Sequence, residues 1–161
     1  MKGYTGKILN VDLSTRTWHE ENLADEIYEK YLSGIGLGAY ILLQRLPPKI
    51  DPLGPKNILG FVAGILSGTG AMFAGRWMVV GKSPLTGGWG DANCGGNFGP
   101  ALKWSGYDGI IFEGTAPEPV WLKIIDGKAE LCDAARLWGK TVPETEDLIQ
   151  EEMGQRCTIA S

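Results

Sequence analysis

Residues 64–99, GILSGTGAMFAGRWMVVGKSPLTGGWGDANCGGNFG, are the stretch around which the rest of the chain is organised. The stretch is dense in glycine, and its only ionised side chains are Arg76, Lys82 and Asp91. Glycine at this density destabilises both helices and strands through the entropy of the chain. We therefore expect these glycines at tight turns, at positions of positive φ, or where the backbone lies close to another surface such as a bound ligand.

Two interpretations of this stretch stay open. In the first, it is a set of tight turns that join short strands and bind nothing. In the second, it is a rigid cradle for a large, flat, anionic ligand, because aromatic residues such as Trp77 and Trp89 alternate with the glycines, whereas flexible linkers lack such anchors. Arg76 supports the second interpretation. It lies in the apolar run RWMVV, the neighbouring sequence offers only Asp91 as a carboxylate, and a phosphate would bind a guanidinium at two points.

The composition limits the class of protein. A chain of 161 residues can bury one core and a small second lobe. A net charge of −4 without a basic stripe argues against binding to nucleic acid. No apolar run reaches the roughly 18 residues of a membrane span. The start MKGYTGK has no signal-peptide core, so we expect a cytoplasmic protein.

The three cysteines give no local metal signature. Cys94, Cys132 and Cys157 are far apart, and none forms a CxxC pair with another. We expect reduced thiols, with Cys132 and Cys157 as small buried or half-buried apolar residues. Cys94 lies inside the glycine-rich stretch, where a role facing a ligand stays open. His19, the only histidine of the chain, is expected on the surface.

The hydrophobic pattern predicts an α+β chain, in which many strands accompany a few separate helices. Pro47-Pro48 should end the second helix, Asp126-Gly127 predicts a hairpin turn, and Thr141 should cap the last helix. We expect a long loop over residues 88–99, and we expect the three strands that follow it to be arranged as a meander. The expected strands are residues 3–13, 17–23, 58–66, 76–84, 107–114, 118–126, 128–134 and 156–161, and the expected helices are residues 25–32, 36–46, 100–105 and 141–153.

Three segments together carry a resemblance to a known family. They are GYTGKILNVDLS at the start, YLSGIGLGAYILL, and the long run from SGTGAMFAGRWMVVGKSP to GYDGIIFEG. Over its whole length the chain resembles the N-terminal domain of the aldehyde:ferredoxin oxidoreductase family, whose members are tungsten- or molybdenum-dependent enzymes. The resemblance implies two β-sheets about a pseudo-two-fold axis, with a paired pterin cofactor (tungstopterin or molybdopterin) lying across them.

The resemblance also implies roles for four residues. Arg76 matches an arginine that contacts the phosphate region of the pterin. Asn93 matches a residue whose backbone carbonyl helps to hold the magnesium ion that bridges the pterin phosphates. Gly95 and Gly96 match glycines that let the backbone approach the pterin closely. We expect no catalytic residue in this segment, because the acid and base residues of the family lie in later domains.

The family enzymes extend well beyond this segment. The cysteines that hold their [4Fe–4S] cluster lie in later domains, so we expect residues 1–161 to be a truncated cofactor-binding domain, incomplete at its C-terminal end and inactive alone. The parent enzyme would convert an aldehyde and water to a carboxylic acid and pass the electrons to ferredoxin. A stand-alone, non-catalytic domain that binds a pterin, another anion or a partner subunit is the alternative. The aldehyde, the choice of metal and the oligomeric state, including a homo-oligomer, stay open.

Overall fold

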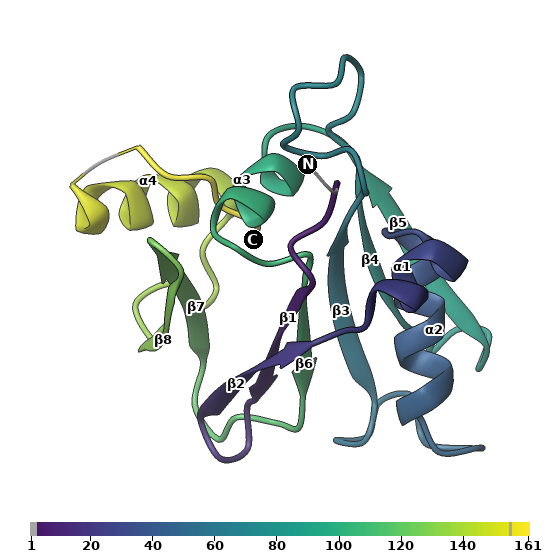
Figure 1. Cartoon of the computed structure of the whole chain (residues 1–161). Helices are drawn as coiled ribbons and strands as arrows, with labels where there is room; N and C mark the ends of the chain where they lie inside the picture. The colour runs from purple at the N-terminus through teal and green to yellow at the C-terminus, as the bar shows by residue number, and fades with distance from the viewer. Residues whose placement is uncertain (1–2, 155) are drawn as a thin grey trace.

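A six-stranded mixed sheet dominates residues 3–154 and 156–161, the part of the chain that the computed structural model describes (Figure 1). Within these residues a two-stranded hairpin and four helices accompany the sheet, which confirms the α+β class. The elements in chain order are β1 (Lys7–Asp12), β2 (Thr17–Asn22), α1 (Asp25–Tyr31), α2 (Ile35–Arg45), β3 (Ile58–Ala63), β4 (Trp77–Lys82), β5 (Trp89–Cys94), α3 (Phe98–Trp104), β6 (Gly109–Glu113), β7 (Val120–Ile125), β8 (Lys128–Asp133) and α4 (Val142–Met153).

The strand order in the large sheet is β2-β1-β6-β3-β4-β5. Strand β6 lies between β1 and β3 and runs parallel to β1, with Leu9 opposite Ile110, whereas the other pairs are antiparallel. The expected meander was therefore wrong. Because Gly109, Ile110 and Ile111 are all buried, β6 suits a central position whose two faces are both covered, and only β7 and β8 pair as a hairpin.

The expected loop over residues 88–99 was also wrong, because Trp89–Cys94 form the edge strand β5. It pairs with β4, so that Lys82 lies opposite Trp89 and Trp77 lies opposite Cys94. The connecting turn is closed where the N–H of Ser83 donates to the carbonyl of Gly88 at 2.8 Å. Glycine, aspartate and asparagine are depleted in strands, so the sequence hid a strand that the pairing with β4 stabilises.

Two further boundaries differ from expectation. Helix α3 starts at Phe98 rather than at residue 100. Residues 156–161 form no strand, because a strand requires a hydrogen-bonded neighbour and no described segment pairs with them. The other expected strands and helices occur, with shifted ends.

The two faces of the sheet are covered by different elements. Helices α1 and α2 cover one face, while α3 and the β7–β8 hairpin cover the other (Figure 1). A third, smaller cluster lies beneath α4. The first cluster consists of Ile8, Tyr28, Leu37, Ile41, Leu42, Ile58, Val62, Met78, Val80 and Ile111, and the second of Leu9, Val11, Ala63, Leu102, Tyr107, Ile110 and Ala129.

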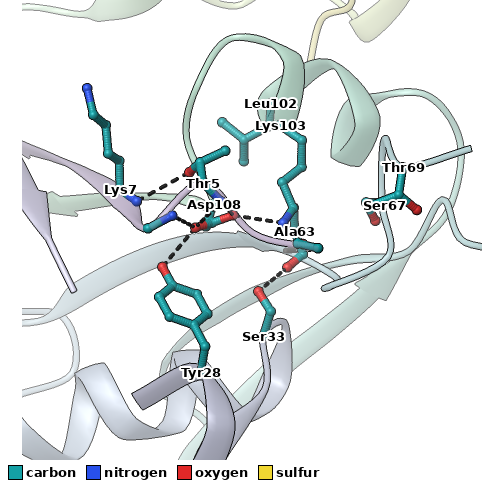
Figure 2. A network of polar contacts seen from close by, with 12 residues as sticks. Thr5, Lys7, Tyr28, Ser33, Ala63, Ser67, Thr69, Leu102, Lys103 and Asp108 are labelled. Atoms are coloured by element: carbon teal, nitrogen blue, oxygen red, sulfur yellow. Dashed lines mark hydrogen bonds and ion pairs between the residues drawn. The ribbon is translucent and has the colours of Figure 1, made fainter. Parts of the chain in front are cut away.

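A buried ionic network ties the N-terminal segment to this core (Figure 2). The Asp108 carboxylate is fully buried and accepts hydrogen bonds from Lys103 Nζ at 2.7 Å, Tyr28 Oη at 2.8 Å and the N–H of Gly6 at 2.7 Å. Burial alone raises the pKa of Asp108, but the hydrogen bonds from Lys103, the N–H of Thr5 and Tyr28, together with the charge of Lys103, outweigh it and the pKa is lowered. Lys103 Nζ also donates to the carbonyl of Gly3, so one charge pair fixes both the start of the chain and α3.

Several local expectations are confirmed. Asp126 and Gly127 have φ of 49° and 76° and form the two-residue hairpin turn. Thr141 precedes α4, where the Glu144 carboxylate accepts from both its N–H and its Oγ1 at 2.8 Å. His19 is exposed. No helix in the described part of the chain is long and apolar enough to cross a bilayer.

Candidate functional site

The candidate site lies where β4 begins and β5 ends. Arg76 directly precedes β4, and its Nη1 donates a hydrogen bond to Oδ1 of Asn93 at 2.8 Å. The ladder brings them together, since Asn93 lies opposite Met78, two residues after Arg76. Both side chains are exposed. The structure thus brings together two of the residues singled out from the sequence.

The acceptor for Arg76 is the amide of Asn93, not the carboxylate of Asp91. Asp91 accepts instead from Nε1 of Trp89 at 2.7 Å, on the same edge strand. A guanidinium has five N–H donors. The bond to Asn93 is the only one that the guanidinium makes among residues 3–154 and 156–161, so several donors remain for an anion.

The turn after β5 is held from within the sheet. Trp77 is 9% exposed, and its Nε1 donates to the backbone carbonyl of Gly95 at 3.0 Å. A Cβ placed on Gly75 would lie 2.9 Å from the carbonyl oxygen of Gly96. The backbone next to Arg76 therefore lies close against the Gly95–Gly96 turn, as a cradle built from adjacent backbones requires.

Gly95 and Gly96 are explained differently by the structure. Gly96 has φ of +82°, a conformation that favours glycine. Gly95 lacks a positive φ, and a Cβ placed on it would meet no atom within 4 Å. Nothing in the described chain requires glycine at position 95. The residue therefore leaves open space in the turn that follows β5.

Cys94 faces the other side of β5. Successive strand residues point to opposite faces, and Cys94 lies opposite Trp77, away from the Asn93 face. With Phe61, Trp77, Gly95 and Phe98 it lines a cavity of about 1020 Å³, whose other wall is formed by α4 and residues 156–161. The side chains of Cys94 and Asn93 therefore lie on opposite faces of β5, while the cavity that Cys94 lines extends to Gly95 at the end of the strand.

The thiols and other potential metal ligands are scattered. Cys94, Cys132 and Cys157 are free and half-buried, as expected for the last two. Burial raises the pKa of the Cys132 and Cys157 thiols. Within residues 3–154 and 156–161, no three His, Cys, Asp or Glu side chains lie together as a metal site.

The sequence did not identify the buried polar residues that hold the backbone around the site and in the core. Ser67 is 2% exposed and bonds to the backbone of Arg76, yet in SGTG it reads only as a turn residue. Lys103 and Asp108 form a buried pair that neither spacing nor composition indicates. Trp77 had a usable signal, because a large aromatic residue among glycines predicts an anchor.

The chemistry of the site suits an anionic, oxygen-rich group. An exposed guanidinium with unused donors binds phosphate well, and the open turn lets a ligand approach the backbone. The residues present therefore fit the phosphate end of a cofactor. Arg76 would hold such a group, with Gly95 and Gly96 bounding it.

Comparisons with known proteins find similar sequences over nearly the whole chain. A sequence profile described as the N-terminal domain of aldehyde ferredoxin oxidoreductase matches residues 8–161. The tungsten-containing aldehyde ferredoxin oxidoreductase of Pyrococcus horikoshii is 49% identical over 156 residues, which are 97% of this chain and 26% of that protein. The enzyme of the same description from Pyrococcus furiosus is 46% identical over 162 residues, covering all of this chain and 27% of that protein.

Two other relatives carry different names. An aliphatic sulfonate oxidoreductase, WOR-like subunit, of Pyrococcus furiosus is 38% identical over 143 residues, 86% of this chain and 22% of that protein. The solved active-site complex BamBC of benzoyl coenzyme A reductase, in complex with 1,5-dienoyl-CoA, contains a chain with a TM-score of 0.93 and 40% identity. The match covers 96% of this chain and 24% of that one. The chain thus spans about a quarter of the length of the relatives it matches.

Proposed function

This chain belongs to the aldehyde ferredoxin oxidoreductase family as its N-terminal domain, and from this premise we propose that it binds the pterin cofactor of a tungsten- or molybdenum-dependent enzyme. The proposed domain comprises residues 1–161. The observation that carries the proposal is the Arg76–Asn93 pair beside an open Gly95–Gly96 turn. Charge and open space then lie at the same end of the β4–β5 pair, for the phosphates of a flat cofactor.

Each residue has a proposed task. Arg76 neutralises phosphate and orients it by a two-point contact. Asn93 fixes the guanidinium through its side chain and offers its backbone carbonyl to a magnesium ion. Gly95 and Gly96 keep the turn free of side chains, so that the cofactor can lie against the backbone.

The reaction belongs to the whole enzyme rather than to this domain. An aldehyde and water become a carboxylic acid, and two electrons and two protons are released, the electrons passing to ferredoxin. The metal centre supplies the redox chemistry, and this domain supplies position and charge. An aldehyde substrate is favoured over the other named chemistries because the aldehyde enzymes are 46 to 49% identical to this chain, against 38% for the sulfonate enzyme and 40% for the benzoyl coenzyme A reductase chain.

We also propose that the β7–β8 hairpin starts the second sheet of the two-sheet base. The hairpin shares one face of the large sheet with α3 and covers only part of that face. Two strands alone are marginally stable, so further strands would complete this layer.

The test uses the protein expressed from the complete reading frame that contains this chain. Purified from cells supplied with tungstate or molybdate, it should contain metal and release a fluorescent pterin on oxidation. It should also reduce benzyl viologen when an aldehyde is added. Protein without metal and pterin would contradict the proposal, and a second polypeptide retained in their place would favour the subunit-binding alternative.

A further inference from the structure

We infer that Ser67 is a positioning residue for the Arg76 anion site, an inference that rests on the function proposed above. Ser67 is 2% exposed, and its Oγ donates to the backbone oxygen of Arg76 at 2.9 Å. The N–H of Gly64 donates to the same oxygen at 2.8 Å. One carbonyl therefore closes the base of the loop formed by residues 64–76.

Glycines surround this carbonyl and leave room for the Ser67 hydroxyl. A Cβ on Gly64 would lie 2.9 Å from the Arg76 oxygen and 3.4 Å from Ser67 Oγ. A Cβ on Gly99 would lie 3.4 Å from both of these atoms. The backbone packs tightly here, so a shift of the carbonyl would displace the residue that carries the guanidinium.

The tip of the loop cannot replace this support. Met72 is 85% exposed and Phe73 is 100% exposed, so neither side chain holds the loop against the protein. Trp104 Nε1 donates to the carbonyl of Gly68 at 3.0 Å, but this bond lies eight residues before Arg76. Strand β4 holds Arg76 from one side, and on the side of the loop it is held at the base, where Ser67 supplies the only side-chain bond to its carbonyl within the described residues.

The experiment compares Ser67→Ala with Ser105→Ala in the isotope-labelled 161-residue chain. Ser105 is a matched control, since its Oγ also donates to a backbone carbonyl, that of Leu102 at 2.7 Å, away from the site. We expect Ser67→Ala to increase the mobility of the Arg76 Nε–H bond in nitrogen relaxation measurements. It should also weaken pyrophosphate binding about 5- to 10-fold, which is the change in affinity that corresponds to the loss of one hydrogen bond. Ser105→Ala should lower the melting temperature about as much as Ser67→Ala does. It should leave the mobility of the Arg76 Nε–H bond and the pyrophosphate affinity as in the wild type.

Separate outcomes judge the inference and the proposed function. Wild-type mobility and affinity in Ser67→Ala would overturn the inference, even if the wild type binds pyrophosphate. Absence of pyrophosphate binding by the wild type would count against the proposed function, and the mobility measured without ligand would still judge Ser67. If Ser67→Ala does not fold, Ser67→Cys, with a weaker donor of similar size, decides on the same mobility criterion.

Discussion

Arg76 combines exposure with a fixed partner, which is the combination that a binding residue needs. Its single hydrogen bond to Asn93 orients the guanidinium and leaves other donors unused among the described residues. The bond is exposed, so its contribution to stability is small. Its contribution to binding can be much larger, because a preset geometry lowers the entropy lost when a ligand is held.

We expect Arg76→Lys to weaken pyrophosphate binding by the 161-residue chain about 10-fold. An ammonium keeps the charge but cannot reproduce the planar two-point contact with phosphate. Isothermal titration calorimetry measures the affinity, and urea denaturation should show a change of free energy of unfolding within about 0.5 kcal/mol, as for other exposed positions. Equal affinity in the two proteins would show that Arg76 makes no two-point contact with the anion.

The sequence predicted the isolated arginine but not its partner. Arg76 could be recognised because an ionised side chain in an apolar run needs an acceptor. Asp91 was the only carboxylate nearby, yet the β4–β5 register places Asn93 within reach of the guanidinium instead. A pairing register depends on which strands meet, and this information does not reside in local composition.

At the scale of elements, the turn after β5 contains two glycines that occur for different physical reasons. Gly96 is required by its positive φ, whereas Gly95 is required by nothing in the described chain. A substitution at Gly95 therefore tests binding without the backbone strain that one at Gly96 would add.

We expect Gly95→Val to leave the fold intact and to abolish retention of the pterin cofactor in the protein expressed from the complete reading frame. A Cβ at this position meets no atom within 4 Å, so the valine side chain extends into the space that the cofactor would use. Gly87→Ala, in the turn between β4 and β5 and away from the site, is the control: it should lower the melting temperature because alanine is strained at φ of +69°, and it should retain the pterin. A Gly95→Val protein with a full complement of pterin would refute the proposed close approach.

The same turn shows why β5 was missed. Strand β4, with its apolar run WMVVGK, was predicted, but β5 reads WGDANC and lacks the β-branched residues of a typical strand. As an edge strand it is stabilised by backbone pairing with β4 rather than by its own burial. Local propensity was overridden by a neighbouring strand.

For the whole molecule, the class was predictable and the topology was not. Alternating strands and capped helices gave α+β, but the insertion of β6 between β1 and β3 depends on long-range pairing. The buried pair of Lys103 and Asp108 also depends on long-range contacts, since it joins α3, α1 and the N-terminal segment. Its partners are up to 103 residues apart in sequence, beyond the reach of local patterns.

The Asp108 network predicts how the whole domain responds to acid. Burial raises the pKa of this carboxyl, but hydrogen bonds from Lys103, the N–H of Thr5 and Tyr28 lower the pKa by more than burial raises it. The net shift of the pKa is therefore downward. A carboxyl with a lowered folded pKa stabilises the protein above its unfolded pKa of about 3.9. This stabilisation is lost as the pH falls through the folded value. The free energy of unfolding of the 161-residue chain, measured with urea, should therefore decrease as the pH falls below about 5.

Asp108→Asn tests this origin of the acid sensitivity. At pH 7 it should cost about 3 to 5 kcal/mol, because Lys103 would stay buried without its counter-charge. Below pH 5 the variant should lose less further stability than the wild type. Glu144→Gln is the control: its carboxyl also has a lowered pKa, through the backbone and side-chain bonds of Thr141, but it is exposed to water and its removal should leave most of the acid slope. An Asp108→Asn profile parallel to that of the wild type would place the acid sensitivity elsewhere in the molecule.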